Sequence, residues 1–464
     1  MADRSGPDIV LICLDSVRKD FFEETATGIA RRSDLSFDQC RAASSWSTPS
    51  HASMISGLLP HEHGVHTHSP SFGNLPADET LFREFEDYRT VGISANAYAG
   101  PAYDFDRYFD RFVELERRVR FPEGADPTRF GSGYENPNRA RIDYVKHCLT
   151  HRHPIKSSFN GVFNMVDKAT GGKLLPRLVD EGAKHGLRLA REEIEEGDGS
   201  TFVFLNLMEG HVPYRPGLHL DGDLYETPWD WSTLSKGTWE LCGEEYDERY
   251  WTRRNQLYRA QIDYLDRRIS AFIDSLDDDV PVVVTADHGD NLGTEVDGGL
   301  ANHKSSLSEG LLHVPLTVCN SSTDYAGDGS AYVSHLQLPD LLSGLRDGRI
   351  EDLGRDRIYA ELIGMSGGSE PDSDYEYWDR MIRCGYRDSE KVVWDSRGNG
   401  HRYRLDGERP NWQREVERVS PPPEWATSRF EADIETYKRR ARSSGETVDV
   451  DEATEERLQA LGYL

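Results

Sequence analysis

Short hydrophobic runs alternate with longer amphipathic stretches along most of the chain. Each run is six to eight residues long, rich in Val, Ile and Leu, and almost uninterrupted by polar residues. This pattern is typical of strands that are buried on both faces of a parallel sheet. The predicted strands are Asp8–Asp15, Thr90–Ala95, Thr201–Leu207, Pro281–Asp287 and His313–Val318.

Amphipathic helices are predicted between these strands. Apolar residues recur at spacings of three and four in Leu178–Glu196 and Leu257–Leu276. Strands that alternate with helices predict an α/β fold with a mostly parallel central sheet flanked by helices. Residues 113–177 and 219–250 interrupt this pattern, and we interpret them as irregular insertions that wall a substrate cleft.

The last quarter of the chain has a different pattern. From about residue 355, short alternating strands surround a Gly398–Asn399–Gly400 turn, which predicts a small antiparallel subdomain. An amphipathic helix is predicted at Val450–Leu461. The domain prediction is therefore an α/β domain over 1–350, with both insertions, and a small C-terminal α+β subdomain over 351–464.

The charge balance restricts the partners. The 464-residue chain has 82 acidic and 54 basic residues, a net charge of −28. Such a surface repels nucleic acid and anionic lipid, so neither is an expected partner without a local basic patch. The scarcity of Lys resembles the composition of proteins from a salt-rich cytoplasm.

Cysteine usage and the N-terminal sequence favour a cytoplasmic protein. The six cysteines form no CxxC pair, which favours reduced, mostly buried thiols. The first apolar run, Ile9–Leu14, is too short for a signal peptide or a membrane span. We therefore expect a cytoplasmic location and no membrane span.

Three candidate metal ligands stand where predicted strands end. Asp15 ends the first strand, and Asp287 and His288 end the Pro281–Asp287 strand, followed by Gly289, which permits a tight backbone path. Open parallel sheets bind ligands beyond the carboxyl ends of their strands. Each Asp alone is more often a cap or turn residue, but the combination favours one shared cation.

A second candidate site lies at Trp46–His51, directly before the predicted helix that contains Ala52–Gly57. A hydroxyl such as that of Ser47, placed where a loop meets a helix N-terminus, suits the binding of an anionic ester. An ordinary Ser/Thr helix cap with Pro49 in the first turn explains the same residues.

The order of several motifs resembles the sulfatases of the alkaline phosphatase superfamily. These motifs are LDSVR, WSTPSHASMISGLLPHEHG, NLMEGHVPY, TADHGD, HKSSLSEGLLHVPL and a final LQALGYL, and they cover about residues 8–360 and the terminal LGYL. The resemblance implies an alkaline phosphatase-like fold and metal-dependent ester hydrolysis. A nucleophile attacks sulfur or phosphorus, and a second step releases the covalent intermediate.

The resemblance also implies roles for individual residues. Ser47 matches the nucleophile position, which sulfatases fill with a formylglycine made from Cys or Ser. One divalent metal ion, which the sequence does not resolve among Ca, Mg, Mn and Zn, is implied at Asp15, Asp287 and His288. Contacts to the anionic ester and its leaving oxygen are implied for His211, His303 and Lys304.

The sequence departs from the family pattern at several positions. His51 replaces the arginine that guides formylglycine installation, and we interpret it either as a substrate contact or as a first-turn helix residue. Asn96 lies in the segment that replaces the family's Lys/His pair, and we expect it to contact substrate. Ser16 replaces the second Asp of the usual pair. Leu207 stands where two-metal phosphodiesterases need an Asp, which favours a mononuclear site.

Three hypotheses follow. The first is a sulfate-ester hydrolase that acts through Ser47 or its formylglycine form, on a small-molecule or glycan ester. The second is a phosphate mono- or diester hydrolase, or a phosphotransferase, with unmodified Ser47. The third, an inactive binding protein of the same fold, is disfavoured by the complete ligand set. The histidines at 61, 63, 66 and 68 lack regular ligand spacing and are interpreted as a structural turn.

Overall fold

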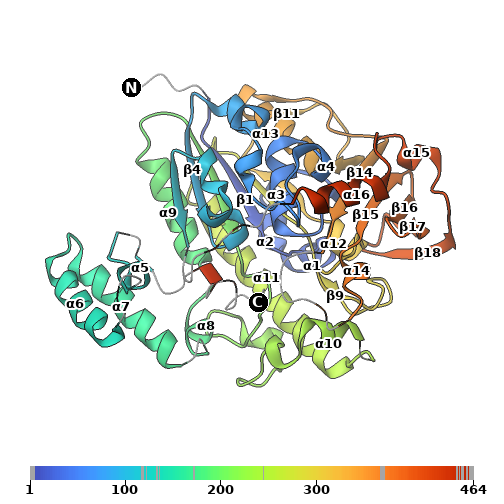
Figure 1. The fold of residues 1–464 in the computed structure, drawn as a ribbon. Helices are drawn as coiled ribbons and strands as arrows, with labels where there is room; N and C mark the ends of the chain where they lie inside the picture. The colour runs from blue at the N-terminus through green and yellow to red at the C-terminus, as the bar shows by residue number, and fades with distance from the viewer. Residues whose placement is uncertain are drawn as a thin grey trace.

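The computed structural model (Figure 1) describes most of the chain. The described residues are 6–115, 120–121, 123–131, 134, 136–170, 173–243, 245–365, 371, 373–445, 448, 450, 454–455 and 458. Among them, no helix is long and apolar enough to cross a membrane. All six cysteines are unpaired thiols, and five of them are buried.

A seven-stranded sheet forms the centre of the molecule, in the order β2-β10-β7-β1-β6-β4-β5. Neighbouring strands from β7 to β5 run parallel, whereas β10 runs antiparallel to β7 and to β2. This confirms the predicted mostly parallel sheet. The strands are β1 (Ile9–Leu14), β2 (Ser33–Ser36), β4 (Arg89–Ser94), β5 (Arg111–Glu114), β6 (Thr201–Leu207), β7 (Val282–Ala286) and β10 (Leu316–Cys319).

Helices cover both faces of this sheet, as predicted for an α/β fold (Figure 1). One face carries α9 (Ala183–Glu195) and α11 (Glu248–Ile273), and the other carries α3 (Ser47–Ser56) and α13 (Leu338–Asp347). The helix α11 begins nine residues before its predicted start, with Asp247 accepting a hydrogen bond from the Tyr250 N–H as its cap. Its first two turns are mostly polar, so the apolar period starts only at Leu257.

The first insertion is helical, so the prediction of an irregular segment over 113–177 was wrong. It contains α5 (Pro127–Gly131), α6 (Pro137–Thr150), α7 (Pro154–Ala169) and α8 (Leu175–Leu178). Arg, Asn and Gly gave this segment the composition of a loop, although α6 and α7 carry apolar residues at helical spacing. The second insertion, 219–250, contains α10 (Thr238–Gly243) and the first turn of α11.

A five-stranded antiparallel sheet lies on the other side of the body, as predicted for the C-terminal part. Its strands are β14 (Arg357–Ile363), β15 (Met381–Arg387), β16 (Glu390–Asp395), β17 (Gly400–Leu405) and β18 (Gln413–Arg418). Buried side chains of β14 and β15 belong to the same hydrophobic cluster as the central sheet. The helix predicted at Val450–Leu461 falls largely outside the described residues.

The remaining elements are short. Three two-stranded pairs join β3 (Gln39–Arg41) to β12 (Tyr332–Ser334), β8 (Asn291–Leu292) to β9 (Ala301–Asn302), and β11 (Asp324–Tyr325) to β13 (Arg349–Ile350). The other α-helices are α1 (Lys19–Thr25), α2 (Thr27–Ala30), α4 (Pro60–His63), α12 (Glu309–Leu312), α14 (Tyr375–Trp378), α15 (Glu424–Thr427) and α16 (Ile434–Ser443). The 3-10 helices are η1 (Phe72–Asn74), η2 (Ala77–Glu79), η3 (Leu81–Phe85), η4 (Ala97–Ala99), η5 (Pro101–Tyr103), η6 (Phe105–Tyr108), η7 (Gly222–Leu224), η8 (Thr233–Ser235) and η9 (His335–Gln337).

Candidate active site

The three candidate metal ligands meet at the carboxyl edge of the central sheet. Asp15 follows β1 and Asp287 follows β7, and these strands pair in parallel with Leu14 opposite Ala286. One ligand atom from each of Asp15, Asp287 and His288 lies within 4.8 Å of the others, and all three side chains are buried. The strand order therefore brings residues that are 272 positions apart into one cluster.

Backbone hydrogen bonds orient two of these ligands. The N–H groups of Ser16 and His288 donate to Asp287 Oδ1, at 3.1 and 2.8 Å. His288 Nδ1–H donates to the Gly289 carbonyl at 2.7 Å, which leaves Nε2 as the lone-pair nitrogen. Asp287 Oδ2 and His288 Nε2 are buried, and neither hydrogen-bonds to a residue that the structure describes. A Cβ at Gly289 would lie 2.1 Å from the Gly310 carbonyl oxygen, so only glycine fits there.

The charge of this cluster fits a cation. Burial and the neighbouring Asp287 charge raise the pKa of Asp15 to about 7. For Asp287, burial opposes ionisation, but the neighbouring histidines His288 and His51 hold its pKa below the usual range. Two buried carboxylates at such close range are stable together when a positive charge lies between them. One oxygen atom from each carboxylate and one imidazole nitrogen could therefore bind one divalent ion.

Ser47 lies next to this cluster as the first residue of α3. Its hydroxyl is directed at Asp15 Oδ2, 3.4 Å away. Asn96 Nδ2 donates both to Ser47 Oγ at 2.9 Å and to Asp15 Oδ2 at 2.6 Å. Its amide thus joins the nucleophile candidate to the ligand candidate, and a contact of Asn96 with substrate stays a prediction. Asn96 therefore acts as a positioning residue for the Ser47 oxygen.

His51 is fully buried beneath Ser47 in the helix α3. Its Nδ1–H donates to the Ser47 carbonyl at 2.7 Å, and its Nε2 accepts from Asn206 Nδ2 at 3.2 Å. Both ring nitrogens are thus engaged inside the protein. Of the two interpretations of His51, this geometry favours the helix residue over the substrate contact.

Two further predicted residues, His211 and His303, lie beside the metal-ligand cluster, and Lys304 follows His303 in the chain. The His303 ring centroid lies 4.9 Å from that of His288 and 5.6 Å from that of His211. Burial lowers the pKa of His211 to about 4, and burial together with His288 holds the pKa of His303 well below its usual range. Burial also lowers the pKa of the adjacent Lys304 to about 8. The three groups assigned to the ester are therefore desolvated, and the Lys304 ammonium lies 5.8 Å from the ring centroid of Trp239.

The sequence reasoning missed a buried arginine behind these histidines. Arg254 of α11 forms an ion pair with Asp290 and donates to Asn302 Oδ1 at 2.8 Å. Its charge contributes to the low pKa of His303. The predicted helix began only at Leu257, so no signal in the sequence placed Arg254 on its buried face; the structure does so because α11 begins at Glu248.

The loop histidines have structural partners. His63 Nε2 lies 3.2 Å from Ser53 Oγ, and its Nδ1 accepts from the Val65 N–H at 3.0 Å. His61 pairs with Glu361, and His68 with Asp379. Among the described residues, the cluster of Asp15, Asp287 and His288 is the group whose donor atoms could share one ion.

Comparison with known proteins adds independent findings. A phosphonate monoester hydrolase from Silicibacter pomeroyi is 15% identical, with 95% of this chain and 96% of that chain covered and a TM-score of 0.57. A protein from Bacteroides thetaiotaomicron assigned as a sulfatase is 14% identical, with coverages of 97% and 96% and a TM-score of 0.55. These similarities show the shared fold. No curated protein matches by sequence.

The family is shown by the sequence itself. The model of the sulfatase family matches residues 7–347, which span β1 to the end of α13 and include every candidate site residue. The chain therefore belongs to the sulfatase family and is a hydrolase of the sulfatase type.

Proposed function

We propose that the protein hydrolyses sulfate esters through the side chain of Ser47, with one divalent cation held by Asp15, Asp287 and His288. The observation that carries this proposal is the position of Ser47 Oγ, 3.4 Å from Asp15 Oδ2 and held at 2.9 Å by Asn96. The bound cation supplies a positive charge that favours the ionised nucleophile and the anionic ester. Sulfate esters of small molecules or glycans are the proposed substrates.

The proposed reaction has two balanced steps. In the first step, the Ser47 oxygen bonds to sulfur, and the bond between sulfur and the alcohol oxygen breaks. Ser47 loses one proton in this step, and the leaving alcohol gains one. With unmodified Ser47, water then releases sulfate and restores the hydroxyl; in the formylglycine form, the attacking oxygen is that of the hydrated aldehyde, and loss of sulfate restores the aldehyde, which water hydrates again. Of the three groups assigned to the ester, Lys304 is the charged one and offsets the negative charge that develops on the ester oxygens, whereas His211 and His303, whose pKa values are lowered, act as neutral contacts to the ester and its leaving oxygen.

A second candidate is a phosphate mono- or diester hydrolase, or a phosphotransferase, that uses unmodified Ser47. His51 favours it, because a buried histidine stands where sulfatases carry the arginine that guides formylglycine installation. Mass spectrometry of the peptide containing Ser47 separates the candidates. Oxidation of the side chain to formylglycine lowers its mass by about 2 Da and supports the sulfatase mechanism. Unmodified serine in fully active protein supports the phosphoester alternative.

The substrate preference gives a direct prediction. We expect aryl sulfate to be cleaved with a kcat/KM at least about tenfold above those of aryl phosphate mono- and diesters, and a chelator to abolish turnover. Divalent ions added back one at a time then identify the metal. A preference for either phosphate ester contradicts the sulfate assignment, and activity that survives complete metal removal contradicts the assigned role of Asp15, Asp287 and His288.

The pH dependence of Lys304 gives a second prediction. Burial lowers the pKa of Lys304 to about 8, so its positive charge is present below pH 8 and is lost as the pH rises through that value. We expect kcat/KM for an anionic ester to fall on this alkaline side. In Lys304→Arg, whose guanidinium stays charged, the fall moves to higher pH by about one unit or more.

The exposed lysine of α7 provides the control for this experiment. Lys168→Arg makes the same chemical change away from the site and is expected to leave the profile unchanged. An alkaline limb that is identical in Lys304→Arg and the unaltered protein contradicts the assignment of Lys304 as the titrating group.

A further inference from the structure

The helices α6 and α7 form a hairpin that protrudes from the body of the protein (Figure 1). Its own buried cluster is small and consists of Ala125, Tyr144 and Cys148. The Tyr144 hydroxyl lies 2.8 Å from the carbonyls of both Ala125 and Ser157, and Ser157 and Asn160 are the residues that α7 buries near it. The side chains on the inner side of the hairpin are therefore largely polar, and the apolar cluster there is small.

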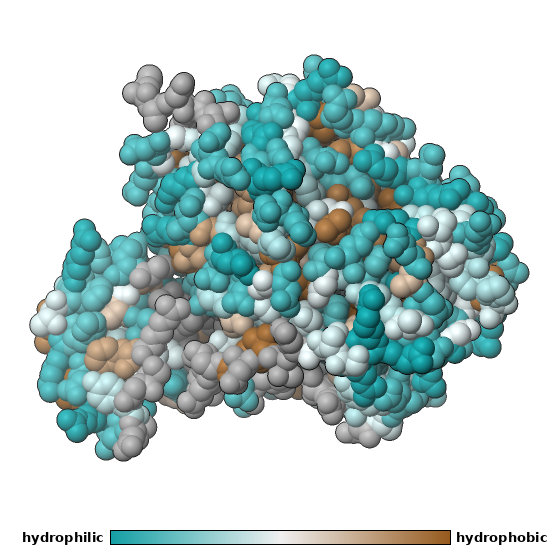
Figure 2. All heavy atoms as spheres, turned by 45° about the horizontal axis from the view of Figure 1, so that its top comes forward, coloured by the Kyte–Doolittle hydropathy of each residue, from teal (hydrophilic) through white to brown (hydrophobic). Residues whose placement is uncertain are grey.

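The outer sides of both helices are apolar. Seven large apolar side chains of the hairpin are between 51% and 75% exposed, and they recur at spacings of three and four, one stripe on each helix. Figure 2 shows hydrophobic surface on this lobe. The residues are Ile142, Val145 and Leu149 on α6, and Ile155, Phe159, Val162 and Met165 on α7. Large apolar side chains exposed in stripes of this kind are typical of an interaction site.

The charge of the hairpin is opposite to that of the chain. Pro137–Ala169 contains six Arg and Lys residues and two Asp residues, whereas the whole protein has a net charge of −28. Five of the six basic residues are exposed, namely Arg139, Arg141, Lys146, Arg152 and Lys168. The hairpin thus supplies the local basic patch without which an acidic protein repels anionic lipid.

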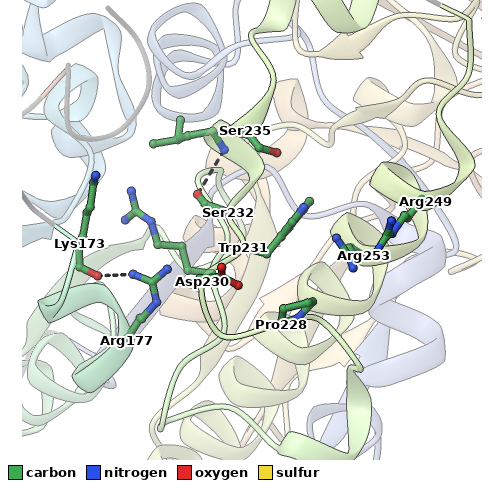
Figure 3. Close-up of a pocket in the computed structure, with 11 residues that line it drawn as sticks. Lys173, Arg177, Pro228, Asp230, Trp231, Ser232, Ser235, Arg249 and Arg253 are labelled. Carbon is green, nitrogen blue, oxygen red and sulfur yellow. Dashed lines mark hydrogen bonds between the residues drawn. The ribbon is translucent and has the colours of Figure 1, made fainter.

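A basic cavity lies where the hairpin joins the body. It has a volume of about 550 Å³ and is walled by both insertions, with Asp230 as its one acidic lining residue (Figure 3). Its basic lining residues are Lys173, Arg177, Arg215, Arg249 and Arg253. Exposed apolar residues also surround Arg177. Its guanidinium lies over the ring of Trp229, and its backbone carbonyl accepts a hydrogen bond from the Leu218 N–H.

We propose that the hairpin and this cavity bind the surface of an anionic lipid bilayer. The two apolar stripes enter the interface between headgroups and acyl chains, and the basic residues, with the cavity, contact lipid phosphates. A free phosphate would use the cavity but not the stripes. A second copy docked hairpin to hairpin would bring two positively charged segments together. An anionic bilayer satisfies both the charge and the exposed apolar surface.

The hairpin also leaves the sheet on the side of the active site. It follows β5, which runs parallel to β4, and the carboxyl ends of these strands share the edge where Asn96 and Asp15 lie. The hairpin and the active site are therefore built on the same edge of the sheet. The attachment itself is independent of the proposed ester chemistry.

Flotation with sealed vesicles tests the proposal. The full-length protein is mixed with vesicles of phosphatidylcholine alone, or with about one quarter phosphatidylglycerol. We expect binding to the anionic vesicles only, weakened at high salt because charges are screened. The variant Leu149→Ser/Ile155→Ser/Phe159→Ser is expected to bind about tenfold or more weakly, and Arg141→Gln/Lys146→Gln/Lys168→Gln to lose most of the salt-dependent part.

Matched controls change the same residue types elsewhere. Val416→Ser removes an exposed apolar residue of β18, and Arg349→Gln removes an exposed charge; both are expected to bind like the unaltered protein. The proposal is overturned if the unaltered protein does not float, or if the triple serine variant floats equally well. A third outcome also overturns it. In that case the unaltered protein sediments as a dimer, the triple serine variant sediments as a monomer, and neither binds vesicles.

Discussion

Replacing Ser47 with alanine is expected to lower kcat by about 10³-fold or more, because no other described hydroxyl lies within hydrogen-bonding range of both Asp15 and Asn96. The fold should persist. The change removes one oxygen at the N-terminus of α3, and the lost hydrogen bond from Asn96 costs about 1 kcal/mol. Thermal unfolding and steady-state kinetics on the same preparation separate a chemical loss from unfolding.

Ser56→Ala is the matched control for this variant. Ser56 lies at the other end of α3 and donates to the Ala52 carbonyl at 2.6 Å, far along the helix from Asp15. We expect it to retain turnover within about twofold. Full activity in Ser47→Ala would show that Ser47 is not the nucleophile, whatever the substrate.

Replacing Asp287 with alanine is expected to lower turnover by about 10³-fold or more and to reduce the bound metal well below one ion per chain. Asp287 Oδ2 is one of the two buried ligand atoms without a hydrogen bond from a described residue, so its loss removes a donor that no neighbour replaces. Elemental analysis of the dialysed protein and kinetics with added metal measure the two effects.

Stability provides a third readout for Asp287→Ala. In metal-free protein, this change relieves the repulsion that raises the pKa of Asp15, but it also removes the acceptor of the buried Ser16 and His288 N–H groups, so the free energy of unfolding should fall by about 1–3 kcal/mol. Added metal should raise the Tm of the unaltered protein but not of the variant.

The corresponding control is His63→Ala, at the end of α4, which removes a buried imidazole bound to Ser53. It is expected to keep its metal. Comparable metal loss from His63→Ala would instead place the ion among the loop histidines.

Much of the fold could be predicted because its signals are local. Each core strand of the parallel region is buried on both faces, so an uninterrupted apolar run identifies it without knowledge of its neighbours. The hairpin of α6 and α7 was missed for the opposite reason. Its apolar residues face solvent and its interior is polar, so the segment resembles a loop in composition.

The candidate site was predictable in part. Asp15, Asp287 and His288 follow predicted strands, and parallel strands end at one edge of their sheet, so their convergence followed from the pattern together with the family motifs. The hydrogen bonds of Asn96 and His51 could not be predicted, although one of the two interpretations of His51, a first-turn helix residue, agrees with its place in α3. Asn96 holds Ser47 and Asp15 together, and His51 lies buried within the protein. Both arrangements depend on contacts between distant segments.

The sequence by itself determined which residues offer the chemistry: a hydroxyl at a helix start, carboxylates and an imidazole at strand ends, and a family order of motifs. Tertiary structure decided how these groups meet. The distances among Asp15, Ser47 and Asn96 depend on β1, β6 and β4 lying side by side. Hydrophobic periodicity specifies which face of an element is buried, but strand order results from the packing of the whole chain.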